Sequence, residues 1–344
     1  SELAFRMLAR SHGATCAYTP MMHARLFRDV PSYRAEQFST AAGDRPLLAQ
    51  FCGNDPETVL AAAMHIVDDV DAIDLNLGCP QRIARRGKYG AFLMDDPATV
   101  SAVIRTLAAR LPVPVTAKMR IFDDVDRTIA FARMLEASGA SLVAVHGRTR
   151  AAKDAASVRA DWDTVAAVKR ALRVPVLANG DVRSLADVGK CLAVTGCDGV
   201  LSAIPLLEDP ALFSEDRETD PAARARRARE YARFAETHAT PARMVRGHAF
   251  RMLAPWLSEF IDLRDELNAQ GLTPAKVAAV AAEAEKRIDA VVAAGRTEPR
   301  PALSDKARAR KEKQEAVAAA IEEAEREATA LAEADAAAAA RAVA

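Results

Sequence analysis

The chain has 344 residues, of which 50% are hydrophobic and 27% charged, so it can bury one large core and still carry a smaller second unit. Lys and Arg total 47 and Asp and Glu total 47, which excludes a global electrostatic attraction to nucleic acid and leaves only local clusters to supply one. No apolar run approaches the roughly 20 residues that span a bilayer, and five cysteines without a CxxC pair argue against a disulfide framework or a metal site.

Short apolar runs alternate with Ala- and Arg-rich amphipathic stretches from residue 16 to about residue 203. This alternation is typical of βα units around a parallel sheet. No GxGxxG motif follows any of the runs, which disfavours an open dinucleotide-binding sheet. We therefore predict an α/β protein with a (β/α)8 TIM barrel whose first strand lies upstream of Ser1. The other seven strands are predicted at residues 16–19, 47–51, 72–75, 115–118, 142–145, 176–178 and 199–201.

Strand signals end after Pro210. Residues 1–214 are predicted to form the catalytic barrel and residues 215–222 an acidic linker. Residues 223–296 have a helical pattern throughout and predict a small all-helical domain of three to five helices, with Thr273 and Pro274 starting one of them. Residues 297–344 are rich in Ala and charge and predict a tail that is helical or disordered.

Polar residues stand where the predicted strands end, which is where barrels carry their active sites. Buried polar groups without partners cost about 1–3 kcal/mol each, so a shared ligand best explains the set. An isoalloxazine ring suits it, because amides can pair with the pyrimidine edge and a lysine can stabilise negative charge near N1. The residues are Gln50, Asn76 with Cys79, Lys118 with Arg120, His146 with Arg148, and Asn179 with Gly180 and Asp181.

The last two βα loops of a barrel commonly bind a phosphate group through backbone N–H groups. These loops are Asn179-Gly180-Asp181 and Ser202-Ala203-Ile204, and Gly180 would let the backbone approach an anion closely. FMN supplies the single phosphate that such a site requires. A strand-end lysine or histidine taken alone is more often a structural hydrogen-bond donor, so the FMN prediction depends on the whole set.

Cys79 lies in the segment Asn76-Leu77-Gly78-Cys79-Pro80, which places its thiol on a stiff loop after a strand. A free cysteine is usually a small buried hydrophobe, but this position favours a reactive thiol. The other cysteines lie in or beside strands and helices and are predicted to be buried; they are Cys16, Cys52, Cys191 and Cys197.

Residues 74–97, DLNLGCPQRIARRGKYGAFLMDDP, resemble the signature of tRNA-dihydrouridine synthases. The segments QFCGNDP, AKMR, VHGRTR, ANGDV and CDGVLSA accompany it in the family's order, and the resemblance covers about residues 1–250. The chain looks most like the eukaryotic branch that acts at positions 16 and 17 of the tRNA D-loop. It departs from the family in lacking the opening Ala-Pro-Met stretch and in carrying Ile204 and Pro205 where Glu and Gly are expected.

The resemblance implies an enzyme in which NADPH reduces FMN, hydride passes from flavin N5 to C6 of uridine, and a cysteine protonates C5. Cys79 matches that cysteine, and a thiol is a far better acid than a serine hydroxyl at neutral pH. The implied flavin-ring contacts are Gln50, Lys118 and His146, and the implied phosphate contacts are Asn179, Gly180, Ala203 and Ile204. Asp181, in the same loop as Gly180, is a further predicted cofactor-binding residue. The implied contacts to uridine or the RNA backbone are Asn76, Arg82, Arg85, Arg86, Lys88, Arg120 and Arg148.

The helical domain is expected to bind tRNA through the cluster of Arg224, Arg226, Arg227, Arg229 and Arg233. Two alternatives stay open. One is a flavin barrel that reduces a free pyrimidine or an enone, and the other is an RNA-binding paralogue with an inactive site. For the tRNA enzyme we expect a cytoplasmic monomer and allow for a nuclear pool.

Overall fold

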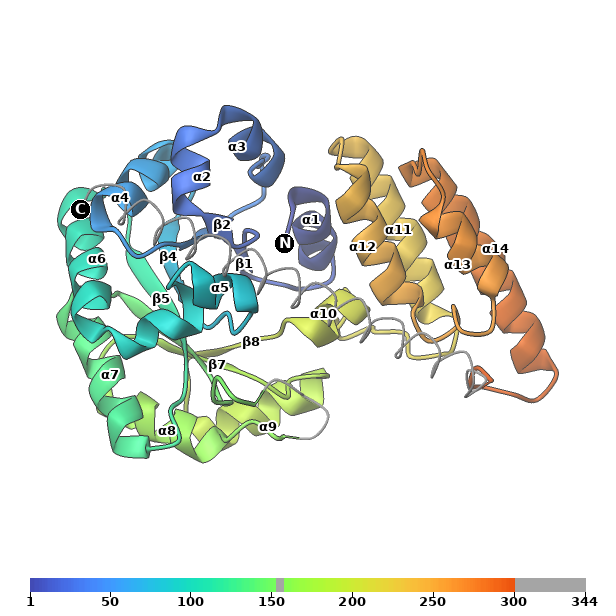
Figure 1. The fold of residues 1–344 in the computed structure, drawn as a ribbon. Helices are drawn as coiled ribbons and strands as arrows, with labels where there is room; N and C mark the ends of the chain where they lie inside the picture. The colour runs from blue at the N-terminus through green and yellow to red at the C-terminus, as the bar shows by residue number, and fades with distance from the viewer. Residues whose placement is uncertain (153–157, 301–344) are drawn as a thin grey trace, which may run out of the picture.

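The strands form one parallel sheet in a computed structural model that describes residues 1–152 and 158–300. The seven predicted strands are confirmed and pair in the order β1-β3-β4-β5-β6-β7-β8, while the short β2 pairs with the end of β3. Among the described strands, β1 and β8 stand at the two ends of this order and do not pair with each other. The sheet is therefore an α/β barrel that is open between them (Figure 1). The strands are β1 Ala17–Tyr18, β2 Met22–His23, β3 Leu47–Cys52, β4 Ala72–Leu77, β5 Val115–Arg120, β6 Leu142–His146, β7 Val176–Asn179 and β8 Gly199–Leu201.

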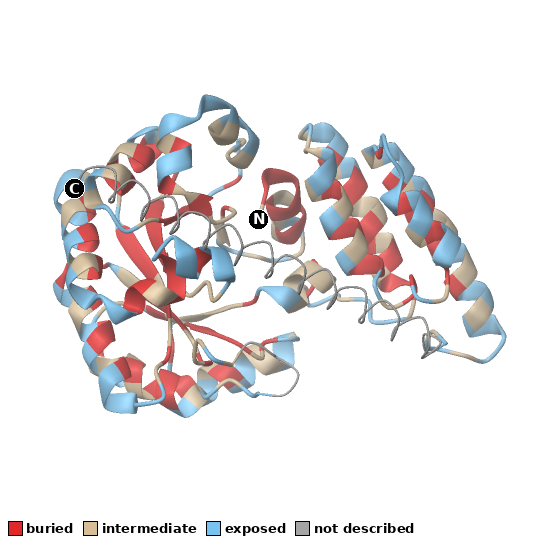
Figure 2. Ribbon diagram, viewed as in Figure 1, coloured by how far each residue is buried: buried red, intermediate tan, exposed pale blue. Residues whose placement is uncertain are grey.

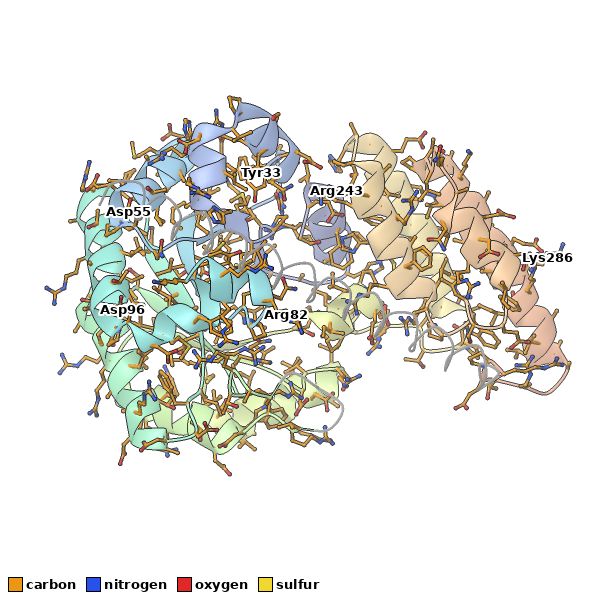
Figure 3. All side chains as sticks on the ribbon, viewed as in Figure 1. Tyr33, Asp55, Arg82, Asp96, Arg243 and Lys286 are labelled. Carbon is orange, nitrogen blue, oxygen red and sulfur yellow. The ribbon has the colours of Figure 1, made fainter. Side chains whose placement is uncertain are left out.

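Helices follow the strands, and the longer ones cover the outer face of the sheet (Figure 1). Several begin at a side chain that accepts a hydrogen bond from a first-turn N–H group; Asp55 and Asp96, labelled in Figure 3, cap two of them. These elements are α2 Ala24–Asp29, α3 Pro31–Gln37, α4 Pro56–Met64, η1 Val67–Asp69, α5 Arg82–Arg86, η2 Gly90–Asp95, α6 Pro97–Arg110, α7 Val125–Ala137, α8 Trp162–Ala171, α9 Leu185–Thr195 and α10 Ile204–Glu208.

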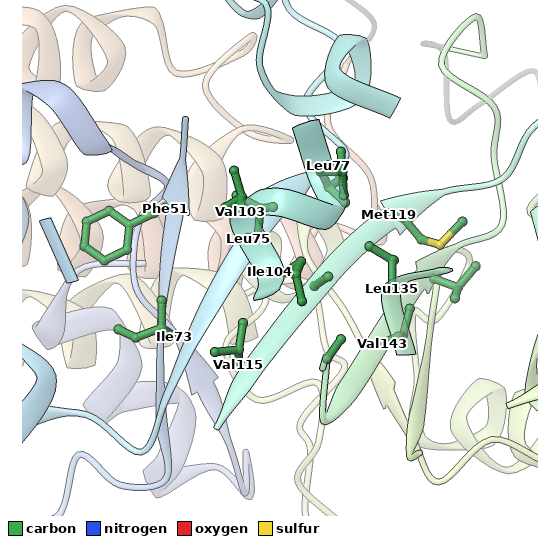
Figure 4. Packing of buried hydrophobic residues seen from close by; sticks show 14 of the residues in the cluster. Phe51, Ile73, Leu75, Leu77, Val103, Ile104, Val115, Met119, Leu135 and Val143 are labelled. Carbon is green, nitrogen blue, oxygen red and sulfur yellow. The ribbon is translucent and has the colours of Figure 1, made fainter. Parts of the chain in front are cut away.

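Alternate residues of each strand point to opposite faces of the sheet, and this alternation separates the core from the site. The central strands of the sheet are largely buried (Figure 2). Leu75 and Leu77 of β4 belong to the apolar cluster that also holds Val103 and Ile104 of α6 (Figure 4). The residue between the two leucines, Asn76, therefore points to the opposite, inner face. One face of each strand thus builds the core while the other is available for polar groups.

The part of the chain beyond the sheet is helical, as predicted, and the structure describes four helices in it, within the predicted three to five. Thr273 accepts a hydrogen bond from the Lys276 N–H group and starts the last helix, which confirms that boundary. The helices are α11 Ala223–Thr237, α12 Ala242–Leu253, α13 Ile261–Asn268 and α14 Pro274–Ala293. The predicted tail lies outside the described residues from residue 301 onward.

The first helix, α1 Leu3–Ser11, packs against the helical domain even though it precedes the sheet in the chain (Figure 1). Phe5 stacks on the ring of His248 with 4.3 Å between centroids, and Glu2 accepts hydrogen bonds from Tyr231 and His248. The arrangement was not evident from the sequence, because the predicted domain ranges assigned the first 214 residues together. Those ranges stay a prediction, with α1 as the segment that joins the two parts.

The joint between α1 and the barrel is a buried ion pair. Asp44 is fully buried and accepts hydrogen bonds from Arg6 Nε at 3.0 Å and Arg6 Nη2 at 2.6 Å, and Arg10 Nε approaches it at 3.2 Å. Removing one partner of a buried pair leaves the other charge without compensation.

The arginine-rich start of the helical domain is engaged in ion pairs within the chain. Arg226 pairs with Glu218 and Asp220, Arg227 with Glu218, and Arg229 with Glu285. Because these guanidinium groups already have carboxylate partners, less of their charge is available to RNA. The predicted RNA contact of this cluster stays a prediction.

Replacement of Asp44 by alanine is expected to lower the free energy of unfolding by about 3–5 kcal/mol, because Arg6 and Arg10 lose their shared carboxylate. Urea unfolding followed by circular dichroism measures the change. Glu57→Ala is the control, because its ion pair with Arg110 is exposed, and it should leave the unfolding midpoint nearly unchanged. Equal effects of the two substitutions would contradict the assignment of Asp44 as a structural joint.

Candidate active site

The candidate site is built from residues that the parallel register aligns across neighbouring strands. Gln50, Asp74 and Thr116 are register partners on β3, β4 and β5. Two positions further along come Asn76 and Lys118, and two further again come Arg120, His146 and Asn179. Since residues two apart share a face of the sheet, the predicted strand-end residues form ascending rows on the inner face.

The lowest row is a hydrogen-bonded network. Asp74 accepts from Thr116 Oγ1 at 2.6 Å and from Gln50 Nε2 at 2.9 Å, and Asn76 Nδ2 donates to Gln50 Oε1 at 2.8 Å. Burial is the largest influence on Asp74 and raises the pKa of its carboxyl to about 6. Two of the predicted site residues, Gln50 and Asn76, are thereby fixed by direct contact.

The loop after β4 holds Cys79 through its backbone. The Gly78 and Cys79 N–H groups both donate to Asn76 Oδ1, at 3.1 and 3.0 Å, and the Cys79 carbonyl accepts from the Ala91 N–H group at 3.0 Å. Arg120 Nε donates to the Gly78 carbonyl at 2.7 Å. The Cys79 side chain packs against Cys52, Ala84 and Tyr89 but is only half-buried, so the residue lies on a fixed loop outside the main core and keeps part of its surface exposed.

Gly90 packs directly against that loop. Its φ of +61° lies in the left-handed region, and a Cβ atom there would stand 2.8 Å from the Cys79 carbonyl oxygen and 3.0 Å from Cys79 Cβ. The sequence contains a glycine eleven residues after Cys79 but gives no sign that the two touch. Gly90 is therefore a residue of the site that sequence reasoning missed.

Lys118 and His146 are half-buried, and the pKa of each side chain is strongly lowered. Burial, with a smaller contribution from Arg120, lowers the pKa of Lys118 to about 8. Burial and the positive charges of Lys118, Arg120 and Arg148 lower the pKa of His146 to about 2, so its ring is neutral at physiological pH. The ammonium group of Lys118 would lie 3.9 Å from a Cβ atom on Gly78, which places it beside the Cys79 loop.

The loop after β7 was predicted to bind phosphate. Gly180 has φ +114°, and a Cβ atom there would approach Ala160 Cβ at 2.8 Å and His146 Cδ2 at 3.3 Å. Asn179 Nδ2 donates to the Leu201 carbonyl at 2.7 Å and so ties this loop to β8. The carboxylate of Asp181 accepts from the Arg148 guanidinium group and from the Ala160 N–H group.

The strand-8 loop leads directly into α10. Ala203 is the N-cap residue, Ile204 is the first helical residue, and Pro205 occupies the first turn. Proline is tolerated there because a first-turn N–H group has no helical partner to lose. Ala203 and Ile204 are both exposed, which leaves the predicted role for their backbone open.

The basic residues after Cys79 lie on the surface. Arg82, Arg85 and Arg86 are exposed on α5, and Lys88 follows in the left-handed conformation with φ +51° (Figure 3 labels Arg82). They form a positively charged rim beside the Cys79 loop. Their predicted contact with the RNA backbone stays a prediction.

Three of the four remaining cysteines fit their prediction, since Cys52, Cys191 and Cys197 are buried. The prediction for Cys16 was wrong: it is exposed, because it precedes β1 at the edge of the sheet. Among the described residues, no group of three or more His, Cys, Asp and Glu side chains could hold a metal ion. No helix in residues 1–152 and 158–300 is long and apolar enough to cross a bilayer.

Comparison with known proteins places these features in a family context. The family model described as Dihydrouridine synthase (Dus) matches residues 1–258. A tRNA-dihydrouridine(16/17) synthase-like protein of Rattus norvegicus, whose name includes NAD(P)(+), is 44% identical over 88% of this chain and 68% of its own length. The tRNA-dihydrouridine(16/17) synthases of Schizosaccharomyces pombe and Saccharomyces cerevisiae are 40% and 41% identical over 80% and 78% of this chain. The matches cover 71% and 66% of the two yeast proteins, and 56% of a similar protein of Mus musculus.

Gly90→Ala is expected to destabilise the protein by about 1–3 kcal/mol more than Gly196→Ala, because only the first substitution drives a methyl group into the Cys79 loop. Gly196 is a matched control: its φ is +63°, and a Cβ atom there would have nothing within 4 Å. Urea unfolding measures the difference, and the rate of Cys79 alkylation by iodoacetamide should change only in the Gly90 variant. Equal effects at both glycines would show that Gly90 is needed only for its left-handed backbone conformation and not for the close approach of the Cys79 loop.

The lowered pKa of Lys118 predicts a pH-dependent stability. Between about pH 8 and pH 10.4 the unfolded chain keeps a proton on this lysine that the folded chain has lost, so the contribution of Lys118 to stability rises with pH. The free energy of unfolding of the wild type minus that of Lys118→Met should therefore rise by about 2 kcal/mol from pH 7.5 to pH 10. A constant difference across this range would indicate an ordinary lysine.

Proposed function

The chain belongs to the dihydrouridine synthase family, and on that premise we propose that it reduces the C5=C6 bond of uridine at positions 16 and 17 of the tRNA D-loop. The relatives named as tRNA-dihydrouridine(16/17) synthases support the substrate, and an NAD(P)-linked reductant follows from their names. The observation that carries the proposal is the fixed, accessible Cys79 loop beside Lys118, on the face where polar residues converge. NADPH is the proposed reductant.

The donor set fits FMN. Within the part of the chain that the structure describes, neither the Lys118 ammonium group nor the His146 ring makes a hydrogen bond or ion pair with another residue. Both side chains are half-buried and keep hydrogen-bond donors that a ligand on this face of the sheet can engage. Gln50 adds a second amide hydrogen, because only one is used by Asp74. When bound there, FMN supplies the hydride that uracil C6 receives.

Cys79 is the proposed proton donor. Addition of hydride at C6 leaves negative charge at C5 and O4 of the uracil ring, and the Cys79 thiol holds the proton that C5 takes up. Lys118 supplies positive charge near the ring system, and the neutral His146 can donate a hydrogen bond without adding charge. Asn76 is already bonded to Gln50 and to the loop, so its proposed contribution to substrate contact is mainly through the loop it fixes.

The phosphate of FMN is assigned to the loops after β7 and β8, with contacts from Asn179, Gly180, Ala203 and Ile204. Gly180 offers backbone where a side chain would clash, and the Asn179 amide links the two loops. Asp181 would repel a phosphate through its carboxylate, so we assign it the orientation of Arg148 and a backbone contact only. Arg148, held in this way, is a candidate for the substrate side of the site together with Arg120.

RNA contact is proposed for the exposed rim of Arg82, Arg85, Arg86 and Lys88. Cations on the surface beside the thiol can neutralise phosphates and steer the extruded base toward it. Arg243 of α12, labelled in Figure 3, pairs with Glu36 of α3, so the helical domain lies beside the barrel at this point and one RNA could reach both. We further propose that the enzyme acts as a monomer in the cytoplasm, with a nuclear pool.

Cys79→Ala should abolish dihydrouridine formation, since loss of a general acid slows a reaction by about 10²–10⁴-fold. The measurement is the dihydrouridine content of tRNA from cells that lack this protein and express either variant or wild type. Cys16→Ala, at an exposed cysteine away from the site, is the control and should restore the modification fully. Mapping the restored positions identifies the uridine.

If the wild type restores nothing despite good expression, the tRNA reductase proposal fails and the inactive RNA-binding alternative takes its place. Reduction of a free pyrimidine or an enone by a variant without residues 223–296 would instead support the small-molecule reductase.

A further inference from the structure

Asp74 is a buried carboxylate that the proposed reaction does not use. It lies in the middle of β4, is completely shielded from solvent, and has both oxygens engaged, one by Thr116 and the other by Gln50. A buried carboxylate is costly, and replacing such a group together with its partners by apolar side chains is often neutral for stability. Its position directly below the Cys79 loop therefore calls for an explanation other than stability.

The hydrogen bonds that start at Asp74 have only one possible direction. The carboxylate oxygen facing Gln50 accepts a hydrogen bond, so Gln50 presents its NH2 group to Asp74 and its carbonyl oxygen to Asn76. Asn76 must then donate its NH2 group to Gln50, which leaves Oδ1 as the atom that faces the loop. Asp74 thus orients the Gln50 amide, and Gln50 in turn orients the Asn76 amide.

The last link in this chain is the backbone of the Cys79 loop. Asn76 Oδ1 accepts from the N–H groups of Gly78 and Cys79, at 3.1 and 3.0 Å. If Gln50 and Asn76 were both turned over, an NH2 group would face these two N–H donors and both hydrogen bonds would be lost. The loop conformation that presents the thiol therefore requires an acceptor at residue 74.

We propose that Asp74 is a positioning residue that orients Gln50 and Asn76 and thereby fixes the backbone of the Cys79 loop. Its importance for turnover rests on the proposed function of Cys79, but its effect on the loop does not. Thr116 donates a hydrogen bond to the second carboxylate oxygen and does not influence how the Gln50 and Asn76 amides are oriented.

The direct measurement is hydrogen exchange of the Gly78 and Cys79 amides, followed by mass spectrometry or NMR on the full chain without added ligand. Asp74→Leu, which removes the acceptor while keeping similar bulk, should speed exchange of these two amides by about tenfold or more, as expected for loss of a hydrogen bond that keeps them closed. Asp74→Asn should restore protection, because its carbonyl can accept from Gln50 while its NH2 group donates to the Thr116 hydroxyl.

Thr116→Val is the matched control, since it removes a buried hydrogen bond to the same carboxylate but leaves the contact with Gln50 intact. It should not change the exchange of the loop amides. If Asp74→Leu does not fold, Gln50→Leu can be used instead, because it interrupts the series of hydrogen bonds one step closer to the loop. It should give the same rapid exchange. Wild-type protection in a folded Asp74→Leu or Gln50→Leu variant would overturn the proposal, and so would loss of protection in Thr116→Val.

Activity provides a separate result. Asp74→Leu should lower kcat for tRNA reduction at least about tenfold with little change in KM for tRNA, and Asp74→Asn should recover most of it. If the wild type has no such activity, the proposed function fails while the exchange result still decides the role of Asp74. Unchanged kcat in an Asp74→Leu variant with rapid loop exchange would show that the fixed loop is not needed for turnover.

Discussion

The parallel register of β3 to β7 is the constraint on which the rest of the site depends. It brings residues from five separate stretches of sequence onto one face, and it sets them in rows that rise toward the carboxyl ends of the strands. A shift of one residue in any strand would send its polar side chain outward into the apolar core and bring an apolar neighbour, such as Phe51 of β3 or Val145 of β6, inward. Core and site are therefore specified by the same alternation.

Within that frame, the Cys79 loop is held by hydrogen bonds on nearly every backbone group. Its N–H groups contact Asn76, its carbonyls accept from Ala91 and Arg120, and Gly90 leaves no free space behind it. A proton donor has to stay within hydrogen-bond reach of the atom it protonates, which is a requirement on position before it is one on acidity. The proposed role of Cys79 depends on this fixed position, which hydrogen bonds with Asn76, Ala91 and Arg120 provide, with one buried carboxylate at the base.

Leu206 and Leu207 of α10 pack against the core of the helical domain, and ion pairs add two further joints to the barrel. α1 packs on α11 through apolar residues and is anchored to the barrel by the buried pair of Arg6 and Asp44. Arg243 and Glu36 form the second joint. The internal pairing of Arg226 and Arg229 shows why a cluster of arginines in a sequence overstates the charge that is open to a nucleic acid.

The sequence by itself determined the seven main strands, the helical character of the second domain and the loop that carries Cys79, because apolar periodicity, helix caps and a Gly/Pro-stiffened turn are local properties. Only the tertiary structure decided which residues touch across strands. It showed that Asp74, Thr116 and Gly90 belong to the site and that Asp181 pairs with Arg148. It also showed that Cys16 is exposed and that α1 packs on the helical domain. Each of these depends on contacts between segments distant in the chain, and the spacing of residues along a sequence carries no record of such contacts.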